Sequence, residues 1–382
     1  ASDVYKRQPL TGSIERDPTP YIVQAQWGIN SLAFSEDGKR IIAGCGNEDI
    51  IIWDVSSGEL VGEHLGQQPP GVPHWLHATA FNQDTTLYSS GLEDGSIAFY
   101  DVTTGQISEI RRQSLEDLTR FTALAFSPDG GMVAGADLLD DSIILWGLVE
   151  DNQLLDPLEG HSSGISTLAF SPNGQILASG GYDTKVILWD VEEGEALADP
   201  LTGHTAKVIG LTFSPDGNWL ASLDSLGNTL LWNLAGEEMI IAREFVGDSR
   251  VDSIAFDAQN DPNTLVSAWC GSGQDDWECV VRRWEVESGT ESGDPIRVYW
   301  PEVVYPILSP EGDIMVTSGD FQVVLWDTVT GVQRDDKIFG ESPLSFNPDS
   351  ESLAIWRLSE SGFFGPKEVS LWDVNRQQQI GV

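Results

Sequence analysis

The sequence has few lysines, few cysteines and no long hydrophobic run. Lysine occurs six times in 382 residues, and 20 basic residues stand against 60 acidic ones, so the formal net charge is −40. Phosphate binding needs clustered Lys and Arg, and this balance argues against DNA or RNA as a partner. No apolar run approaches the roughly 20 residues that a membrane helix needs. We therefore expect no nucleic-acid partner and no membrane partner.

Cysteine is equally scarce, and three cysteines cannot make a disulfide framework. Cys270 and Cys279 flank a short loop, and a tight hairpin could bring them within bonding reach. We expect two unlinked thiols in a cytoplasmic protein. The alternative is a linked pair, which would favour a secreted or periplasmic protein.

Aromatic residues and glycine are plentiful. Hydrophobic residues make up 40% of the chain, with 14 Trp and 14 Phe, which excludes a disordered protein. The 39 glycines exceed the usual share of roughly 7% and indicate many tight turns. The string Asp3 to Gln8 resembles the translated end of a sequencing-library adapter. We interpret residues 1–8 as a non-native tail and the chain as a fragment.

One pattern repeats along the whole chain. An apolar strand ending in Phe-Ser leads into a Pro-Asp-Gly-like turn, as in 126–130, 170–174 and 213–217. A second strand, a polar hairpin and an apolar strand ending in an aromatic residue follow. These aromatic residues are Trp53, Tyr100, Trp146, Trp189, Trp232, Trp284, Trp326 and Trp372. Their spacings of 42 to 52 residues fit the period of four-stranded propeller blades.

These repeats resemble WD40 repeats, best in the copies from Gly160-His161 to Trp189-Asp190 and from Gly203-His204 to Trp232-Asn233. The resemblance implies an all-β, WD40-like β-propeller, with residues 9–382 as a single domain of eight four-stranded blades. Seven blades plus an extra repeat is the alternative. Because both ends fall within repeats, we expect outer strands from the two ends to pair in the last blade, with Gln8–Gly12 as the first of them.

The resemblance also implies a hydrogen-bonded tetrad of His, Ser or Thr, Asp and Trp within a blade. The fourth copy supplies all four: His161, Ser179, Asp183 and Trp189. The fifth copy has His204, Ser222 and Trp232, but Leu226 stands where the Asp is expected. We expect the tetrad bonds to be absent from most other copies.

Signals for chemistry are weak. There is no Gly-x-Ser-x-Gly elbow, no phosphate-binding glycine loop and no calcium-loop spacing. His74 and His77 flank Trp75, but no Cys or carboxylate stands at a zinc-finger spacing. We predict no catalytic residue, no metal and no cofactor.

The distribution of charge and aromatic residues suggests one face for binding. Hairpins between second and third strands share a face of this fold and carry acidic residues in most copies, which would attract a basic protein or peptide. An aromatic arc is predicted there over copies six, seven, eight, one and two. The candidate residues are Trp27, Trp75, Trp269, Trp277, Trp300, Phe363 and Phe364, with Asp275 and Asp276. The alternative is that these aromatic side chains fold inward and that the acidic face is simply solvated.

We therefore predict a non-catalytic module for protein–protein interaction, either ligand-sensing or a scaffold. The phrasing of copies four and five resembles bacterial repeats, which implies a place in a larger bacterial signalling protein. The alternatives are a stand-alone exported propeller and, less favoured, a propeller enzyme.

Overall fold

The computed structural model describes strands along most of the chain. The described residues are 23–25, 29–34, 39–45, 50–55, 61, 79–81, 87–91, 96–101, 106–112, 121–137, 140–148, 156–235, 240–245, 251–257, 263–272, 277–299, 306–309, 312–319, 322–334, 338–339, 341–347, 350–358, 367–376 and 378–380. These residues form β-strands and turns, and none of them lies in a helix.

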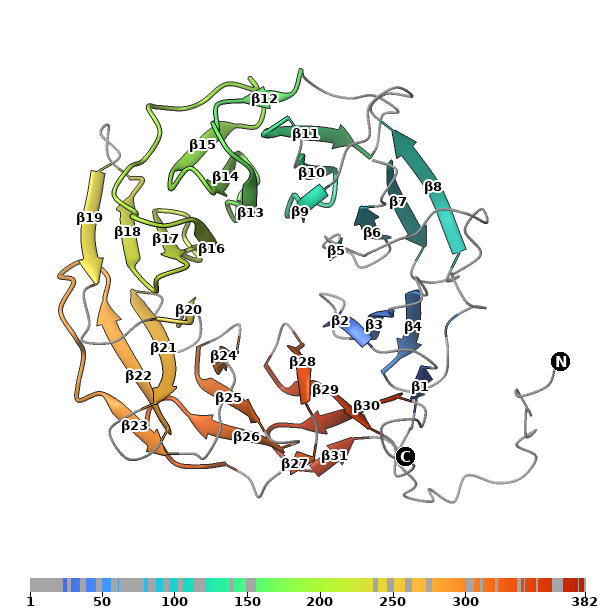
Figure 1. Cartoon of the computed structure of the whole chain (residues 1–382), viewed down its shortest axis with the longest axis vertical. Helices are drawn as coiled ribbons and strands as arrows, with labels where there is room; N and C mark the ends of the chain where they lie inside the picture. Colours follow the sequence, from blue (N-terminus) through green and yellow to red (C-terminus); the bar gives the residue numbers. More distant parts are fainter. Residues whose placement is uncertain are drawn as a thin grey trace, which may run out of the picture.

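The described strands form eight antiparallel sheets that follow one another around a ring (Figure 1). The first holds β2 (Ile29–Phe34), β3 (Arg40–Cys45) and β4 (Ile50–Asp54), and the second β5 (Thr79–Phe81), β6 (Leu87–Gly91), β7 (Ser96–Asp101) and β8 (Gln106–Arg112). The third holds β9 (Phe121–Phe126), β10 (Met132–Asp137), β11 (Ser142–Gly147) and β12 (Leu158–Glu159), and the fourth β13 (Ile165–Phe170), β14 (Ile176–Gly181) and β15 (Val186–Asp190).

The fifth sheet holds β16 (Val208–Phe213), β17 (Trp219–Asp224), β18 (Thr229–Asn233) and β19 (Ile240–Phe245), and the sixth β20 (Ser253–Phe256), β21 (Thr264–Ser272), β22 (Trp277–Glu285) and β23 (Ile296–Tyr299). The seventh holds β24 (Pro306–Leu308), β25 (Ile314–Gly319), β26 (Gln322–Asp327) and β27 (Ile338–Phe339). The eighth holds β28 (Glu341–Phe346), β29 (Ser352–Leu358), β30 (Lys367–Asp373), β31 (Gln378–Ile380) and β1 (Val23–Ala25).

The prediction of four strands in every copy is too regular. The fourth sheet has three named strands, and its outer edge is reduced to two isolated bridges, Val186 with Leu201 and Trp189 with Ala196. A polar, glycine-containing segment follows Asp190, and such a segment has few side chains that favour a strand. The first sheet likewise shows three strands among its described residues.

Strands from early and late in the chain, β1 and β31, pair with the same strand, β30. Val23 and Ala25 of β1 pair with Val369 and Lys367 of β30, while β31 pairs with the other half of β30. The pairing of outer strands from both ends therefore occurs in the eighth sheet. The segment Gln8–Gly12, which we expected to provide the first of these strands, lies outside the described residues, as do residues 1–8.

The hydrophobic core lies between neighbouring sheets. Trp189 of β15 packs in one cluster with Leu145 of β11, and Trp232 of β18 packs with Leu188 of β15. A single sheet has two faces, and burial of both requires a neighbour on each side. The ring arrangement follows from this requirement.

The Phe-Ser-Pro-Asp-Gly turns hold the inner hairpins in register. In the fifth sheet the Ser214 hydroxyl accepts a hydrogen bond from the Trp219 N–H (3.0 Å) and donates to Asp216 (2.5 Å). Gly217 takes a φ of +73°, which a residue with a side chain rarely adopts. The same geometry recurs around Ser171 in the fourth sheet.

Candidate interaction surface

A chain of four side chains crosses the fourth sheet from its interior to its hairpin. The Trp189 Nε1–H donates to Ser179 Oγ (2.8 Å), and Ser179 Oγ lies 2.8 Å from His161 Nε2. The other ring nitrogen of His161, Nδ1, donates to Asp183 Oδ1 (2.9 Å). The His161 and Asp183 side chains are 0% and 4% exposed. The arrangement satisfies each of these buried polar groups, and it ties the loop before β13 to the hairpin after β14.

The fifth sheet contains a corresponding set of four side chains, in which the aspartate comes from a different position. Ser222 Oγ lies 2.8 Å from Trp232 Nε1 and 2.6 Å from His204 Nε2. Asp224 Oδ2 lies 3.3 Å from His204 Nδ1, and the Asp224 side chain is fully buried. Leu226, the residue in the expected aspartate position, is instead exposed.

The register explains this exchange. Ile165 pairs with Gly181 in the fourth sheet and Val208 pairs with Asp224 in the fifth, so Gly181 and Asp224 are equivalent positions. A Cβ atom on Gly181 would lie 2.6 Å from both His161 Nδ1 and Asp183 Oδ1. The space that glycine leaves open for Asp183 is the space that the Asp224 side chain occupies. Alignment of the fifth copy with the fourth did not identify Asp224 as the aspartate of the tetrad. The sequence signal for it was an aspartate two residues before the expected position.

Both aspartates are stabilised in the ionised form. Burial alone would raise the pKa of Asp183, but hydrogen bonds from the Ser162 N–H and from His161 outweigh it and lower the pKa below the ordinary 3.8. Burial also opposes ionisation of Asp224, and donors from Asn228 and the Leu226 N–H lower its pKa on balance.

One bond of this tetrad persists in two other sheets, and the described strands of the third sheet lack it. Trp284 Nε1 donates to Ser267 Oγ (2.9 Å) in the sixth sheet, and Trp326 Nε1 donates to Thr317 Oγ1 (2.9 Å) in the seventh. The third sheet replaces the serine with Gly135, and the Phe121 ring packs edge-on against Trp146 with 5.5 Å between ring centroids. Among the described residues, the bond from the tryptophan to the hydroxyl thus recurs in two of the other sheets, without the histidine and the aspartate.

The hairpin tips beside the tetrads of the fourth and fifth sheets expose apolar side chains. Tyr182, at the tip between β14 and β15, is 49% exposed, and Leu226, at the tip between β17 and β18, is 60% exposed. The Lys207 ammonium lies 4.9 Å from the centre of the Tyr182 ring, and the Lys207 carbonyl accepts a hydrogen bond from the Ser225 N–H (2.9 Å). Ile209, two residues beyond Lys207, is 41% exposed. The loop before β16 therefore connects the two tips. We give the name Tyr182 patch to the exposed side chains of Tyr182, Ile209 and Leu226 together with the half-buried Lys185 and Lys207 of the same loops.

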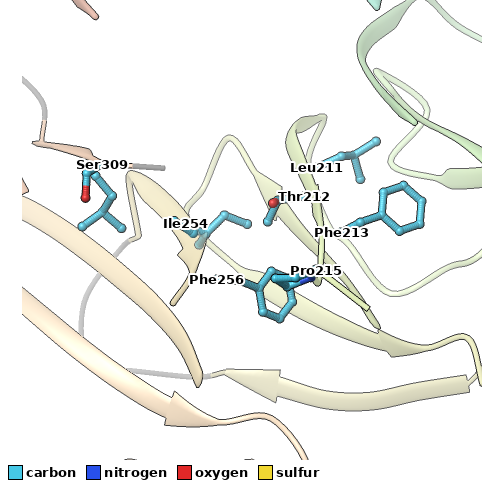
Figure 2. A pocket seen from close by; sticks show the side chains of 9 residues that line it. Leu211, Thr212, Phe213, Pro215, Ile254, Phe256 and Ser309 are labelled. Atoms are coloured by element: carbon cyan, nitrogen blue, oxygen red, sulfur yellow. The ribbon is translucent and has the colours of Figure 1, made fainter. Parts of the chain in front are cut away.

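A second feature is a recess along the inner strands β16, β20 and β24 (Figure 2). Its volume is about 470 Å³, and it is lined by residues that include Leu211, Phe213, Ile254, Phe256 and Leu308, with Thr212 and Ser309 as the polar contributors. None of the side chains that line it is charged. The recess therefore carries no charged side chain with which to select a ligand.

The predicted aromatic arc falls largely outside the described residues. Trp27, Trp75, Trp300, Phe363 and Phe364 lie there, together with Asp275 and Asp276. Trp277 begins β22, and only its backbone is described. Trp269 is half-buried and lies along its own strand, where a Cβ on Gly271 would be 2.6 Å from the indole. The described residues therefore do not test whether these aromatic side chains form an arc.

Cys270 and Cys279 form a disulfide, which corrects the expectation of two free thiols. They stand directly opposite one another in the pairing of β21 with β22, with 4.1 Å between their Cα atoms. The register of this nine-residue pair of strands brings the cysteines together, and this is the tight hairpin that the sequence left open as the alternative.

No group of three or more His, Cys, Asp or Glu side chains that could hold a metal ion comes together within the described ranges. The same ranges contain no helix long and apolar enough to cross a membrane.

Comparison with known proteins agrees with this architecture. The family described as "WD domain, G-beta repeat" matches residues 21–54, 152–190 and 196–233. Human WD repeat and SOCS box-containing protein 1 is 32% identical over 141 residues, which are 37% of this chain and 31% of that protein. Periodic tryptophan protein 2 homolog of Dictyostelium discoideum is 28% identical over 166 residues, 43% of this chain and 17% of that protein. The chain thus spans less than a third of the length of these relatives.

A chain in a crystal structure of the mitotic checkpoint complex has a similar fold, with a TM-score of 0.61 and 21% identity over 86% of this chain and 97% of that one. The fold and the tetrads define an all-β protein with the architecture of a WD40-like propeller. Three segments of the chain are similar to WD40 repeats. The relatives named above are eukaryotic, so they give no support to a bacterial source.

Proposed function

We propose that this protein is a non-catalytic binding module that docks a protein or peptide on the hairpin face of its ring. WD40 repeat proteins typically mediate protein–protein interaction, and the fold and repeats place this chain among proteins of that architecture. The observation that carries the proposal is the Tyr182 patch. Large apolar side chains are exposed on two adjacent tips, and buried tetrads hold both tips in place. Rigid, exposed apolar residues are the usual anchors of interfaces because they lose little entropy on binding.

The ring itself is proposed to consist of eight blades. Eight sheets of described strands and the placement of β1 and β31 on the same edge of β30 support this count. In this arrangement residues 9–382 act as one domain, and the pairing of β1 and β31 with β30 holds the ring together. The aromatic arc and a basic partner remain predictions for the hairpins outside the described residues.

Random-peptide phage display on the immobilised chain tests the proposed function. Peptides that are selected repeatedly, and that bind as synthetic peptides in fluorescence anisotropy, would support a docking module. Selection of no peptide above an empty surface, with or without reducing agent, would contradict it.

A second candidate is an exported propeller with the same docking role. The Cys270–Cys279 disulfide favours it, since disulfides persist in oxidising compartments, whereas a cytoplasmic location favours reduced thiols. Mass spectrometry of alkylated protein from the native source distinguishes the two locations. A fully alkylated pair would rule out the exported candidate.

A further inference from the structure

The Tyr182 patch differs in charge from the rest of this acidic protein. We propose that it binds a segment with an apolar anchor flanked by acidic residues, in contrast to the basic partner that the overall charge suggests. The inference rests on the proposed docking function and names the partner chemistry of that site.

The charge of the patch follows from the burial of its carboxylates. The loops and hairpins that build it, residues 161–165, 180–186, 203–209 and 224–229, contain two aspartates and two lysines as their Asp, Glu, Lys and Arg residues. Asp183 and Asp224 are turned inward to His161 and His204, and their side chains are 4% and 0% exposed. The loops of the patch therefore carry two lysines, and both of their aspartates are buried.

The two lysines are available for a partner. Lys185 and Lys207 are partly exposed, and neither forms an ion pair with another described residue. Lys207 lies over the Tyr182 ring, which holds its charge beside the apolar surface. A carboxylate of a partner could reach these ammonium groups while an apolar side chain contacts Tyr182, Ile209 and Leu226.

The net charge of −40 does not prevent this interaction at physiological salt. The Debye length is then about 8 Å, so exposed charges further away are largely screened. The local pair of lysines decides which charge a docked segment prefers, and the apolar side chains provide most of the affinity.

Fluorescence anisotropy with two matched peptides tests the proposal. One labelled peptide carries Leu and Phe between Glu and Asp residues, and in the other Lys replaces every acidic residue. We expect the acidic peptide to bind the intact chain more tightly. Lys207→Glu should weaken that binding about fivefold, and Leu226→Ala about tenfold. Val332→Ala is the matched control, because Val332 is equally exposed (61%) but lies in the turn after β26.

A charge exchange makes the test specific. Lys207→Glu should improve binding of the lysine peptide, which a loss of folding could not do. Circular dichroism and the melting temperature of each variant give the structural control. Equal binding of both peptides, or unchanged binding by Lys207→Glu and Leu226→Ala, would overturn the proposal.

Two further outcomes distinguish a failure of this inference from a failure of the proposed docking function. If display peptides bind and the patch variants leave their affinity unchanged, the chain is a docking module that uses another surface, and this inference fails alone. If light scattering shows a dimer that Leu226→Ala dissociates, the occupant is a second copy of the chain, and the assignment to an acidic peptide is wrong.

Discussion

Asp224 lies 3.3 Å from the Nδ1 atom of His204 and takes the role that Asp183 has beside His161 in the neighbouring sheet. The two aspartates stand at different positions of their hairpins, with Asp224 equivalent to Gly181. The tetrad therefore depends on the spatial position of the carboxylate beside the histidine. The aspartate that supplies this carboxylate can differ in sequence position by two residues.

Exchange of the aspartate position in the fifth sheet tests this equivalence. Asp224→Gly should destabilise the protein by about 2–4 kcal/mol, because it removes the carboxylate beside His204 and leaves the Asn228 and Leu226 N–H groups without their acceptor. Adding Leu226→Asp recreates the pattern of the fourth sheet and should restore part of the loss. Chemical denaturation measures both values. Leu226→Asp alone, at an exposed position, is the control and should change stability by less than about 0.5 kcal/mol.

Acid should weaken the protein through the same aspartates. A carboxylate whose pKa is lowered on folding contributes stability that is present above its unfolded pKa, near 3.8, and is lost as the pH falls through the folded pKa. Between about pH 5 and pH 2, the range in which Asp titrates, wild type should lose more unfolding free energy than Asp224→Asn. A parallel pH dependence of the two proteins would show that the Asp224 carboxylate is not stabilised by folding.

Ser179 and Ser267 should differ in their contributions. Ser179 contacts both Trp189 and His161, so Ser179→Ala leaves two buried groups without a partner and should cost about 2–3 kcal/mol. Ser267→Ala removes the bond from Trp284 and should cost about 1 kcal/mol. Denaturation in urea gives both values. Equal losses would mean that the bond to His161 adds nothing to the fourth sheet.

A serine at position 135 of the third sheet should destabilise the protein, although other sheets have a serine or threonine at this position. A Cβ on Gly135 would lie 2.9 Å from the rings of Phe121 and Trp146, so Gly135→Ser should destabilise by about 1–3 kcal/mol through overpacking. Phe121→Ala in the same protein removes one clash, and the two substitutions together should cost less than the sum of the single ones. Additive losses in this double-mutant cycle would show that Phe121 and Gly135 are independent.

The disulfide predicts how many cysteines react with a thiol reagent. In denaturant without reductant, the thiol reagent DTNB should titrate one cysteine per chain, since three cysteines less the linked pair leave Cys45. Reduction should raise the count to all three and lower the unfolding free energy by about 2–3 kcal/mol, as expected for closing a short loop. Cys45→Ser is the control and should leave no thiol before reduction. A count of three without reductant would contradict the linked pair.

Much of the fold was predictable from local pattern. The repeated Phe-Ser-Pro-Asp-Gly turn and the aromatic residue at the end of each third strand predicted the strand order and the residues that pack between sheets. Trp189 and Trp232 are buried there. Such signals are local, because strand alternation and turn chemistry depend on residues a few positions apart.

The site was less predictable. The sequence placed the candidate face on aromatic residues in the long hairpins, of which Trp269 is half-buried and lies along its own strand. The exposed Tyr182, Ile209 and Leu226 gave no signal, because an apolar residue at a hairpin tip looks the same in sequence whether it points inward or outward. Exposure depends on the neighbouring blade, which stands more than 40 residues away in these repeats.

The sequence by itself determined the repeat, the all-β class, the excess of negative charge and the four residues of the fourth tetrad. Only the tertiary structure decided that Asp224 replaces the expected aspartate, that Cys270 faces Cys279, and that Lys207 connects the tips bearing Tyr182 and Leu226. The physical reason is the same in each case. The register within the sheets and the packing of neighbouring sheets set these distances, and neither can be derived from the local pattern of residue types.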